Sequence, residues 1–268
     1  MQKKRFLAGL CVTALMSMSL SGAAFAQFAG PKVADAKPGD VRLIVTAAIR
    51  EPLDAVKDKL QAAVGKPVVV EYGSARGNLK DEILKGQGFE VAILLPDVNQ
   101  DLLAAGKIAP QAFEIARVPI ALGLRGDATI DVSTPEGIKK ALLGAASVKY
   151  SPTGAALLTV KKVMDDLDLT GKVKDNSAIR GEVPLAAGEY EINIYPLSEI
   201  IPNKKLKSLG PVIPALQVPS ILQAVISKNP NDAKAARAVI AFLQGHAIDG
   251  ALKADGMNKS TINTKLGQ

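Results

Sequence analysis

Strand-like and helix-like stretches alternate along the first half of the chain. Short apolar or β-branched runs predict strands at 41–45, 68–71 and 89–96. Between them, apolar residues recurring every three or four positions predict helices at 52–64, 79–84 and 97–105. Strands that alternate with helices of this length are typical of a mainly parallel sheet covered on both faces.

The middle of the chain repeats this alternation with more proline. Strands are predicted at 117–127, 147–151 and 190–195, and helices at 133–144, 153–169 and 232–243. Proline-bearing crossings near Pro119 and at 211–219 indicate a central excursion. We therefore predict an α/β fold with one lobe formed by 41–117 plus 218–268 and a second lobe formed by 118–217, each a mainly parallel sheet flanked by helices.

The first 26 residues have the pattern of a secretory signal peptide. Three basic residues at positions 3–5 precede an apolar run, and Ala24 and Ala26 supply the small residues that suit cleavage before Gln27. A membrane anchor is the alternative, but no second long apolar run follows. We predict that 1–26 are removed on export and that 27–40 form a loose leader.

The charge of the exported chain is mild. Removing the three basic residues of the signal peptide leaves 30 of 33 Lys and Arg against 26 Asp and Glu, so the net charge falls from +7 to +4. Aromatic residues are only 4% of the chain, and no basic run is interleaved with them as stacking platforms for bases would require. Nucleic acid is therefore not an expected partner.

Residues for catalysis or metal binding are scarce. The only cysteine, Cys11, lies in the signal peptide, and the only histidine, His246, follows a glycine near the predicted end of a helix. Tyr72 and Arg76 stand where a nucleophile elbow around Ser74 would need glycines. The aspartates at 165–168 follow helical spacing and lack a calcium-loop pattern. We expect no catalytic residue, metal or cofactor, and keep a secreted hydrolase or isomerase as the alternative.

Three strand-to-helix loops remain as candidate binding elements. They are 46–50, 73–77 and 150–156, and in an open α/β sheet ligands bind beyond the carboxyl ends of the strands. The second loop places Ser74 and Arg76 between two glycines at the start of a helix, where backbone NH groups and the helix dipole favour an anion.

The order and spacing of these stretches resemble the type II periplasmic solute-binding proteins, most closely the molybdate-binding branch that serves ABC importers. The matching stretches are VRLIVTAAIREPLDAV, VVVEYGSARGNLKDEILKGQGFEVAILLPDVNQDLLAAGKI, SVKYSPTGAALLTVKKVMDDLDL, YEINIYPLSEII, AVIAFLQG and ADGM. The resemblance implies a periplasmic monomer whose two lobes close on a small anion in the cleft between them and which then docks on a membrane permease.

The resemblance also implies which residues contact the ligand. The expected set is Thr46, Ala48, Ile49 and Arg50 in the first loop, Ser74, Ala75 and Arg76 in the second, Ser151, Thr153 and Gly154 in the third, and Tyr195 on the second lobe. The family has a serine where this chain has Ala48, which removes one hydrogen bond to a tetrahedral oxyanion.

The two arginines add charged, forked donors that suit a carboxylate, so an organic acid and a molybdate-like oxyanion both stay open as ligands. Each position also has a structural interpretation. Thr153 is a good helix N-cap, Arg50 and Arg76 could pair on the surface, Ser74 could satisfy its own turn, and Tyr195 could lie in the core.

Overall fold

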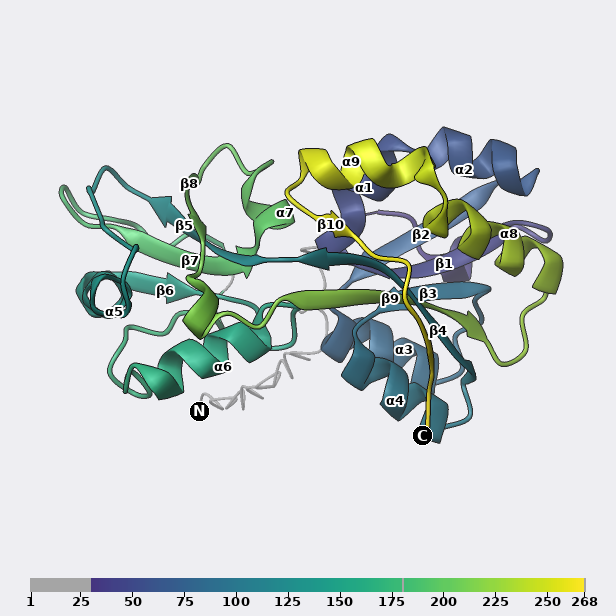
Figure 1. Ribbon diagram of the computed structural model, residues 1–268, viewed down its shortest axis with the longest axis horizontal. Helices are drawn as coiled ribbons and strands as arrows, with labels where there is room; N and C mark the ends of the chain where they lie inside the picture. The colour runs from purple at the N-terminus through teal and green to yellow at the C-terminus, as the bar shows by residue number, and fades with distance from the viewer. Residues whose placement is uncertain (1–29, 180, 268) are drawn as a thin grey trace, which may run out of the picture.

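The computed structural model describes residues 30–179 and 181–267 and contains two sheets in that part of the chain. The predicted signal peptide lies outside the described residues. The strands of the larger sheet are β1 (Val41–Thr46), β2 (Val68–Gly73), β3 (Val91–Leu94), β4 (Ile108–Val118), β9 (Ser220–Ser227), β10 (Asn258–Lys259) and β11 (Asn263–Lys265). We call this sheet and its helices the larger lobe (Figure 1).

The larger sheet is mixed. Its order is β10-β4-β9-β3-β1-β2, with β11 also paired to β4. β1 runs parallel to β2 and β3, whereas β9 is antiparallel to both β3 and β4, and the C-terminal strands are antiparallel to β4. The expectation of a mainly parallel sheet therefore holds only for β1 to β3, because β9 runs opposite to them and all the remaining pairings of the sheet are antiparallel.

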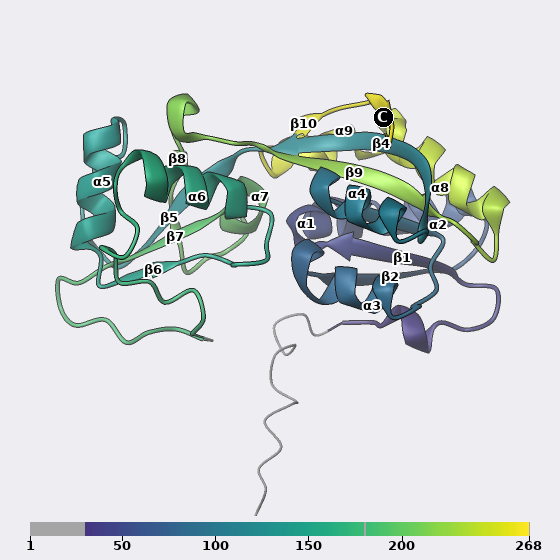
Figure 2. The same cartoon turned by 90° about the horizontal axis from the view of Figure 1, so that it is seen from below.

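Helices cover both faces of the larger sheet, as Figures 1 and 2 show. They are η2 (Val33–Asp35), η3 (Ala47–Ile49), α1 (Arg50–Ala55), α2 (Lys57–Val64), η4 (Ala75–Leu79), α3 (Lys80–Leu84), α4 (Pro96–Ala104), α8 (Ala233–Gln244), η6 (His246–Ile248) and α9 (Asp249–Ala254). The predicted helix over 52–64 is broken at Val56, whose φ and ψ of −113° and 7° are not helical. α8 begins as predicted, because the Asp232 side chain accepts a hydrogen bond from the Ala235 N–H at 2.8 Å.

The smaller lobe is built on a second mixed sheet of order β6-β7-β5-β8. Its elements are β5 (Ile120–Arg125), α5 (Pro135–Gly144), β6 (Ser147–Lys149), α6 (Leu157–Asp166), β7 (Glu191–Pro196), α7 (Leu197–Ile200), β8 (Lys207–Pro211) and η5 (Pro214–Leu216). Of its three pairings, only β6 with β7 is parallel, so the mainly parallel expectation is wrong here. Thr134, at the start of the helix predicted over 133–144, caps α5 by accepting from the Gly137 N–H at 3.0 Å.

Each lobe has its own hydrophobic core. The larger core takes residues from 33–118 and 222–266, together with Ala155, and the smaller core takes residues from 120–216. Leu43, Leu53 and Leu79 are fully buried in the larger core, and burying a leucine contributes about 1.5–3 kcal/mol. Each lobe therefore has a core that does not depend on packing against the other lobe.

The chain crosses between the lobes twice, and the crossings lie side by side. β4 continues into β5 through Pro119, and Val118 pairs with Ser220 at the start of β9. The Gln217 side chain accepts from the Ile120 N–H at 2.8 Å and so joins the two crossings. Figure 1 shows the two crossings side by side between the lobes, and Figure 2 shows them along one edge of the molecule, as expected of a hinge.

Two predicted strands have different bounds. The strand expected over 117–127 is split at Pro119, which has no N–H to donate, so β4 ends at Val118 and β5 begins at Ile120. β4 also reaches back to Ile108, beyond the predicted strand. The register shifts near Ala112 and Ala116 interrupt the strict alternation of buried and exposed residues by which a strand is predicted. The predicted helix over 153–169 begins only at Leu157.

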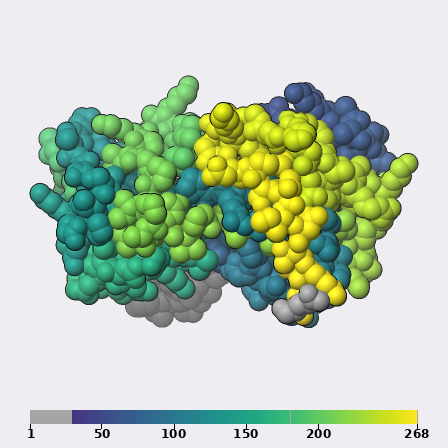
Figure 3. Space-filling view, viewed as in Figure 1, coloured from purple at the N-terminus to yellow at the C-terminus, as the bar shows by residue number. Residues whose placement is uncertain are grey.

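The C-terminal residues cross the outside of the larger lobe. β10 and β11 both pair with β4, and Figure 3 shows this segment in yellow on the face of the molecule. Within 30–179 and 181–267, every helix is too short or too polar to span a bilayer.

Candidate functional site: the cleft between the lobes

A cavity of about 660 Å³ lies between the two lobes. The larger lobe contributes the loops after β1 and β2, and the smaller lobe contributes β5, β7 and three neighbouring loops. Of the predicted site residues, the cavity lining includes Thr46, Ser74, Ser151, Thr153, Gly154 and Tyr195. The two lobes therefore bring residues together that are up to 149 positions apart, counted from Thr46 to Tyr195.

The first loop lines the cavity with its first two residues only. Thr46 is 3% exposed and stands at the end of β1. Ala48 and Ile49 point into the larger core, and the Ala48 carbonyl accepts a hydrogen bond from the Ser198 hydroxyl at 2.7 Å. Because Ser198 lies on α7 of the smaller lobe, this bond joins the lobes.

Arg50 lies over an aromatic ring of its own lobe. The guanidinium carbon is 4.6 Å from the centroid of the Tyr72 ring, within the range of a cation–π contact. Burial and the hydrogen bond from the Tyr72 hydroxyl to Asp54 raise the pKa of Tyr72, and the nearby Arg50 opposes that rise. Arg50 therefore lies against Tyr72 and is not one of the residues that line the cavity.

The second loop is pinned by its own side chains. The Ser74 N–H donates to Asn78 Oδ1 at 2.9 Å, and Ala75 is fully buried. Gly77 has φ and ψ of −106° and −122°, and an added Cβ there would lie 3.0 Å from the Thr153 hydroxyl oxygen. The glycine therefore permits the loop to approach the loop before α6 closely.

Ser74 and Thr153 meet directly at this approach. The Ser74 hydroxyl lies 2.7 Å from both the hydroxyl and the carbonyl oxygen of Thr153. Gly154 continues the contact, since its N–H donates to the Ser151 carbonyl at 3.2 Å and keeps the loop tight. Thr153 does not cap α6, whose N-cap is Ala156. The hydroxyl of Thr153 is free of a capping role and faces Ser74.

Arg76 ties the second loop to the third. Its Nε and Nη2 donate to the Asp97 carboxylate at 2.6 and 3.0 Å, and its Nη1 donates to the Gly154 carbonyl at 2.7 Å. The Arg76 N–H also donates to the Thr153 carbonyl at 3.1 Å. The bonds to Gly154 and Thr153 join the two loops, and the pair with Asp97 of α4 fixes the guanidinium, which is only 14% exposed.

Tyr195 and Glu199 face the cavity from the smaller lobe. Burial, with Glu199 and Glu191 nearby, raises the pKa of Tyr195 to about 12, so its hydroxyl stays protonated and can donate. Burial also raises the pKa of Glu199 from 4.5 to about 7, although Arg50 opposes that rise. Glu199 is a half-buried carboxyl that carries a proton for part of the time at neutral pH.

A polar network on the same strand as Tyr195 was not predicted from the sequence. Glu191 and Asn193 line the cavity, and Arg125 of β5 donates to both carboxylate oxygens of Glu191 at 3.1 Å. Burial raises the pKa of Glu191, but hydrogen bonds from Arg125 and its neighbours outweigh burial and lower it overall. The alternating stretch 190–195 carried the signal, because residues two and four before Tyr195 share its face of the strand.

Two lysines of the cavity lining contact one segment of the smaller lobe. The Lys149 ammonium donates to the Gly181 carbonyl, and Lys205 pairs with Glu182 at 2.5 Å. The Lys205 and Glu182 side chains are 72% and 54% exposed, so this pair is weak. Neither lysine was expected, because each lies outside the three loops singled out in the sequence.

The lining of the cavity carries charges of both signs. Its basic residues are Arg125, Lys149 and Lys205, and its acidic residues are Asp81, Glu182, Glu191 and Glu199. The described residues contain no cluster of three or more histidines, cysteines, aspartates or glutamates that could hold a metal ion. His246 is exposed and pairs with Asp249 at 2.9 Å, outside the cavity lining.

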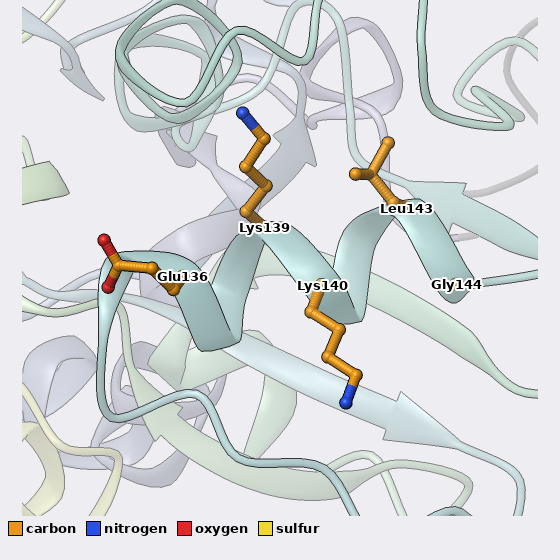
Figure 4. Close-up of a pocket in the computed structure, with 5 residues that line it drawn as sticks. All are labelled: Glu136, Lys139, Lys140, Leu143 and Gly144. Carbon is orange, nitrogen blue, oxygen red and sulfur yellow. The ribbon is translucent and has the colours of Figure 1, made fainter.

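Figure 4 shows a second hollow, at the outer end of the smaller lobe. Its lining is Glu136, Lys139, Lys140, Leu143 and Gly144. All five residues belong to α5, and the two lysine side chains point in opposite directions (Figure 4). A hollow on one helix gives a ligand no opposing wall, so the cleft between the lobes is the better candidate.

A two-lobed α/β protein with a polar cleft at its hinge has the architecture of a solute-binding protein. A family model described as bacterial extracellular solute-binding protein matches residues 41–258. The chain belongs to this family, and the resemblance noted in the sequence is confirmed. A comparison with curated protein sequences finds no match.

Solved structures with the same fold include two proteins named for molybdenum or molybdate and one named for sulfate. The substrate binding domain of a putative molybdenum ABC transporter from Clostridium difficile has a TM-score of 0.60 and 15% identity, over 82% of this chain and 99% of that one. The periplasmic molybdate-binding protein of Azotobacter vinelandii has a TM-score of 0.59 and 21% identity, over 81% and 98%. The sulfate-binding protein SubI of Mycobacterium tuberculosis H37Rv has a TM-score of 0.62 and 13% identity, over 82% and 87%.

These likenesses establish the two-lobed fold. Membership of a solute-binding family also agrees with the expectation that the protein is not an enzyme. Because the identities are low, the named ligands belong to those proteins and do not by themselves transfer to this one.

Proposed function

We propose that the protein is the periplasmic receptor of an ABC importer and captures a small anion, either an organic carboxylate or a molybdate-like oxyanion, in the cleft between its lobes. The observation that carries this proposal is the cavity lined from both lobes at the carboxyl ends of β1 and β2, where binding sites of open α/β sheets lie.

Donors for an anion come from both lobes. The hydroxyls of Thr46 and Ser74 face the cavity from the larger lobe, and Ser151, Thr153 and Tyr195 face it from the smaller lobe. A protonated tyrosine and four further hydroxyls can donate to carboxylate or oxyanion oxygens. We propose these five residues and Gly154 as the ligand contacts, with Ala48, Ile49, Arg50, Ala75 and Arg76 shaping the loops that carry them.

The lobes that close on the ligand are proposed to be 41–117 plus 218–268 and 118–217. The paired crossings at Val118 and Ser220 would act as the hinge. Small-angle scattering with and without a bound anion tests this proposal, because hinge closure shrinks the molecule without changing its secondary structure. An identical profile at saturation would argue against closure.

Delivery and location follow from the same proposal. The A. vinelandii protein is a periplasmic molybdate-binding protein, the C. difficile protein is the substrate binding domain of a putative molybdenum ABC transporter, and this chain has their fold. We propose cleavage after Ala26, a monomer in the periplasm and a membrane permease as partner. Intact mass of periplasmic protein tests cleavage, and light scattering tests the monomer.

The decisive experiment for capture is a thermal-shift screen of the mature protein against small organic acids, molybdate, tungstate and sulfate. A ligand that binds only the folded state raises the melting temperature by mass action. We expect at least one anion to raise it in a saturable way. If only cations or neutral solutes do so, the anion assignment fails while the solute-binding family stands.

A further inference from the structure

The face that β7 presents to the cleft has a regular pattern. Glu191, Asn193 and Tyr195 alternate along the strand and line the cavity. The residues between them, Ile192 and Ile194, are fully buried in the core of the smaller lobe. The strand thus builds a continuous polar wall on the cleft from every second residue.

Asn193 is held in one orientation on this wall. Its amide nitrogen donates to Glu191 Oε1 at 3.1 Å, and its side chain is nearly buried at 7% exposure. The amide oxygen could not take that place, because a carboxylate accepts hydrogen bonds and repels another acceptor. Among the described contacts, the amide oxygen is therefore left to accept a bond from the cleft.

The charges around Asn193 disfavour a ligand made only of acceptors. Arg125 is engaged by Glu191, with 3.1 Å between Arg125 Nε and Glu191 Oε1. The lining has four acidic residues against three basic ones. A fully deprotonated tetrahedral oxyanion has no donor for the Asn193 oxygen and would leave it unpaired on dehydration, which costs about 1–3 kcal/mol.

The size of the cavity also favours a larger ligand. Its volume of about 660 Å³ lies in the range of roughly 300–1,000 Å³ that is typical of pockets for organic molecules. The lobes already touch through Ser74 with Thr153 and through Ser198 with Ala48, at 2.7 Å each. An ion with four oxygens around one atom would fill only part of it.

We infer that the cleft takes a hydroxylated organic carboxylate, whose carboxylate accepts from the Tyr195 hydroxyl and from the ammonium of Lys149 and whose hydroxyl groups donate to the amide oxygen of Asn193. This inference rests on the proposed function, since it concerns the same cleft. The half-buried Lys149 donates to a neutral carbonyl, which a carboxylate can replace as a stronger acceptor.

Matched pairs of acids test the inference by calorimetric titration of the mature protein. The pairs are gluconate with hexanoate and glycerate with propionate, which differ in hydroxyl groups at equal chain length, and molybdate and sulfate complete the set. We expect the hydroxylated member of at least one pair to bind at least tenfold more tightly than its partner. That ratio corresponds to about 1.4 kcal/mol.

Asn193→Leu should abolish this preference, because leucine has a similar size and no acceptor. Asn99→Leu is the matched control, since Asn99 is a fully buried asparagine of α4 outside the cavity lining. Tyr195→Phe keeps the ring and should weaken both members of a pair equally. The phenylalanine variant keeps the inference testable if Asn193→Leu does not fold.

The outcomes separate the inference from the proposed function. A hydroxyl preference that survives Asn193→Leu overturns the role of Asn193. Tighter binding of molybdate or sulfate than of every hydroxy acid overturns the inference and leaves the anion receptor in place. If no anion of either class binds wild-type protein, the proposed function itself fails.

Discussion

The two walls of the cleft are built in different ways. The wall of the larger lobe consists of the loops and helix starts that follow parallel strands, with Thr46, Ser74, Asn78 and Asp81 as its polar residues. The wall of the smaller lobe is mainly the face of β7, with charged residues from β5 and the neighbouring loops. Both walls offer hydroxyls, and the smaller wall adds most of the charged residues, including all three basic ones.

The bonding of the two walls differs as well. Polar groups of the larger lobe reach across to the loop before α6, as Ser74 and Arg76 do. In the smaller lobe the Ser198 hydroxyl also reaches across, to the Ala48 carbonyl, whereas Glu191 bonds within its own lobe to Arg125. The contacts near Ser74 and at Ser198 therefore join the lobes, whereas the β7 network braces one wall from within its own lobe.

The largest effect is expected where the β7 network is broken. Glu191→Ala removes a carboxylate that is 3% exposed and leaves Arg125 and Asn193 without their partner. Breaking a buried pair in this way should cost about 3 kcal/mol of unfolding free energy, or roughly 10 °C in melting temperature. Urea and thermal unfolding measure both.

Glu182→Ala is the matched control for Glu191→Ala. Glu182 is also a cavity-lining acid paired with a base, but its side chain is 54% exposed. We expect it to change stability by less than about 1 kcal/mol. Equal losses in the two variants would show that the β7 network is no more rigid than the surface.

The next largest effect is expected at the contact between the loops. Arg76→Ala removes three side-chain bonds, two to Asp97 and one to Gly154. We expect a loss of about 2 kcal/mol, because bonds to charged groups contribute about 1.5–3. Arg237→Ala, on the exposed face of α8, should be nearly neutral in the same unfolding assay. A neutral Arg76→Ala would mean that this contact does not stabilise the folded protein.

A third effect depends on pH. The pKa of Glu199 is raised from 4.5 to about 7, so the folded protein binds a proton more tightly than the unfolded chain between these values. The folding stability therefore falls as pH rises from about 4.5 to 7 and stays constant above that. At about 1.4 kcal/mol per pKa unit the shift corresponds to about 3 kcal/mol. Because Glu199 is only half-buried, solvent screening reduces this, and we expect Glu199→Gln to be more stable than wild type at pH 8 by roughly 1–2 kcal/mol.

Melting temperatures of the ligand-free protein at pH 8 and at pH 4.5 check this prediction. At the lower pH both side chains are neutral, and the two proteins should melt at nearly the same temperature. A constant difference at both values would show that the effect of the substitution does not come from the proton.

The smallest effect is expected at the hydroxyl pair. Ser74→Ala and Thr153→Val each remove one side of a 2.7 Å contact, and the net contribution of such a bond is about 0.5–1.5 kcal/mol. A double-mutant cycle measures the coupling between the two side chains. If the coupling is present in the ligand-free protein and disappears when an anion is bound, the ligand replaces the contact. If the coupling is zero in both states, the contact between Ser74 and Thr153 does not stabilise the protein.

Much of the larger wall could be predicted from the sequence, because each of its loops directly follows a short apolar strand. The positions of Thr46 and Ser74 at the ends of β1 and β2 follow from that local pattern. The partner of Arg76 did not follow, since Asp97 is 21 residues away and Gly154 is 78 residues away along the chain. Contacts of that separation depend on how the lobes are placed.

The smaller wall was harder to predict. The alternation at 190–195 indicates which residues share a face of β7, but which face meets the cleft depends on the helices that cover the other one. Arg125 and Glu191 are register partners on antiparallel strands 66 residues apart. Strand register at that distance is not contained in either local pattern.

By itself, the sequence determined the alternation of strands and helices, the two proline-marked crossings and the loops at the ends of β1 and β2. It also predicts the export signal. These features rest on short-range properties, namely side-chain periodicity, capping and the missing N–H of proline. Only the tertiary structure decided that β4 and β9 run antiparallel through the larger sheet, that Arg76 holds two loops together, and that Asn193 and Glu191 face the cavity. These depend on which distant segments pack together, because a side chain's role in a cleft is set by the opposite wall.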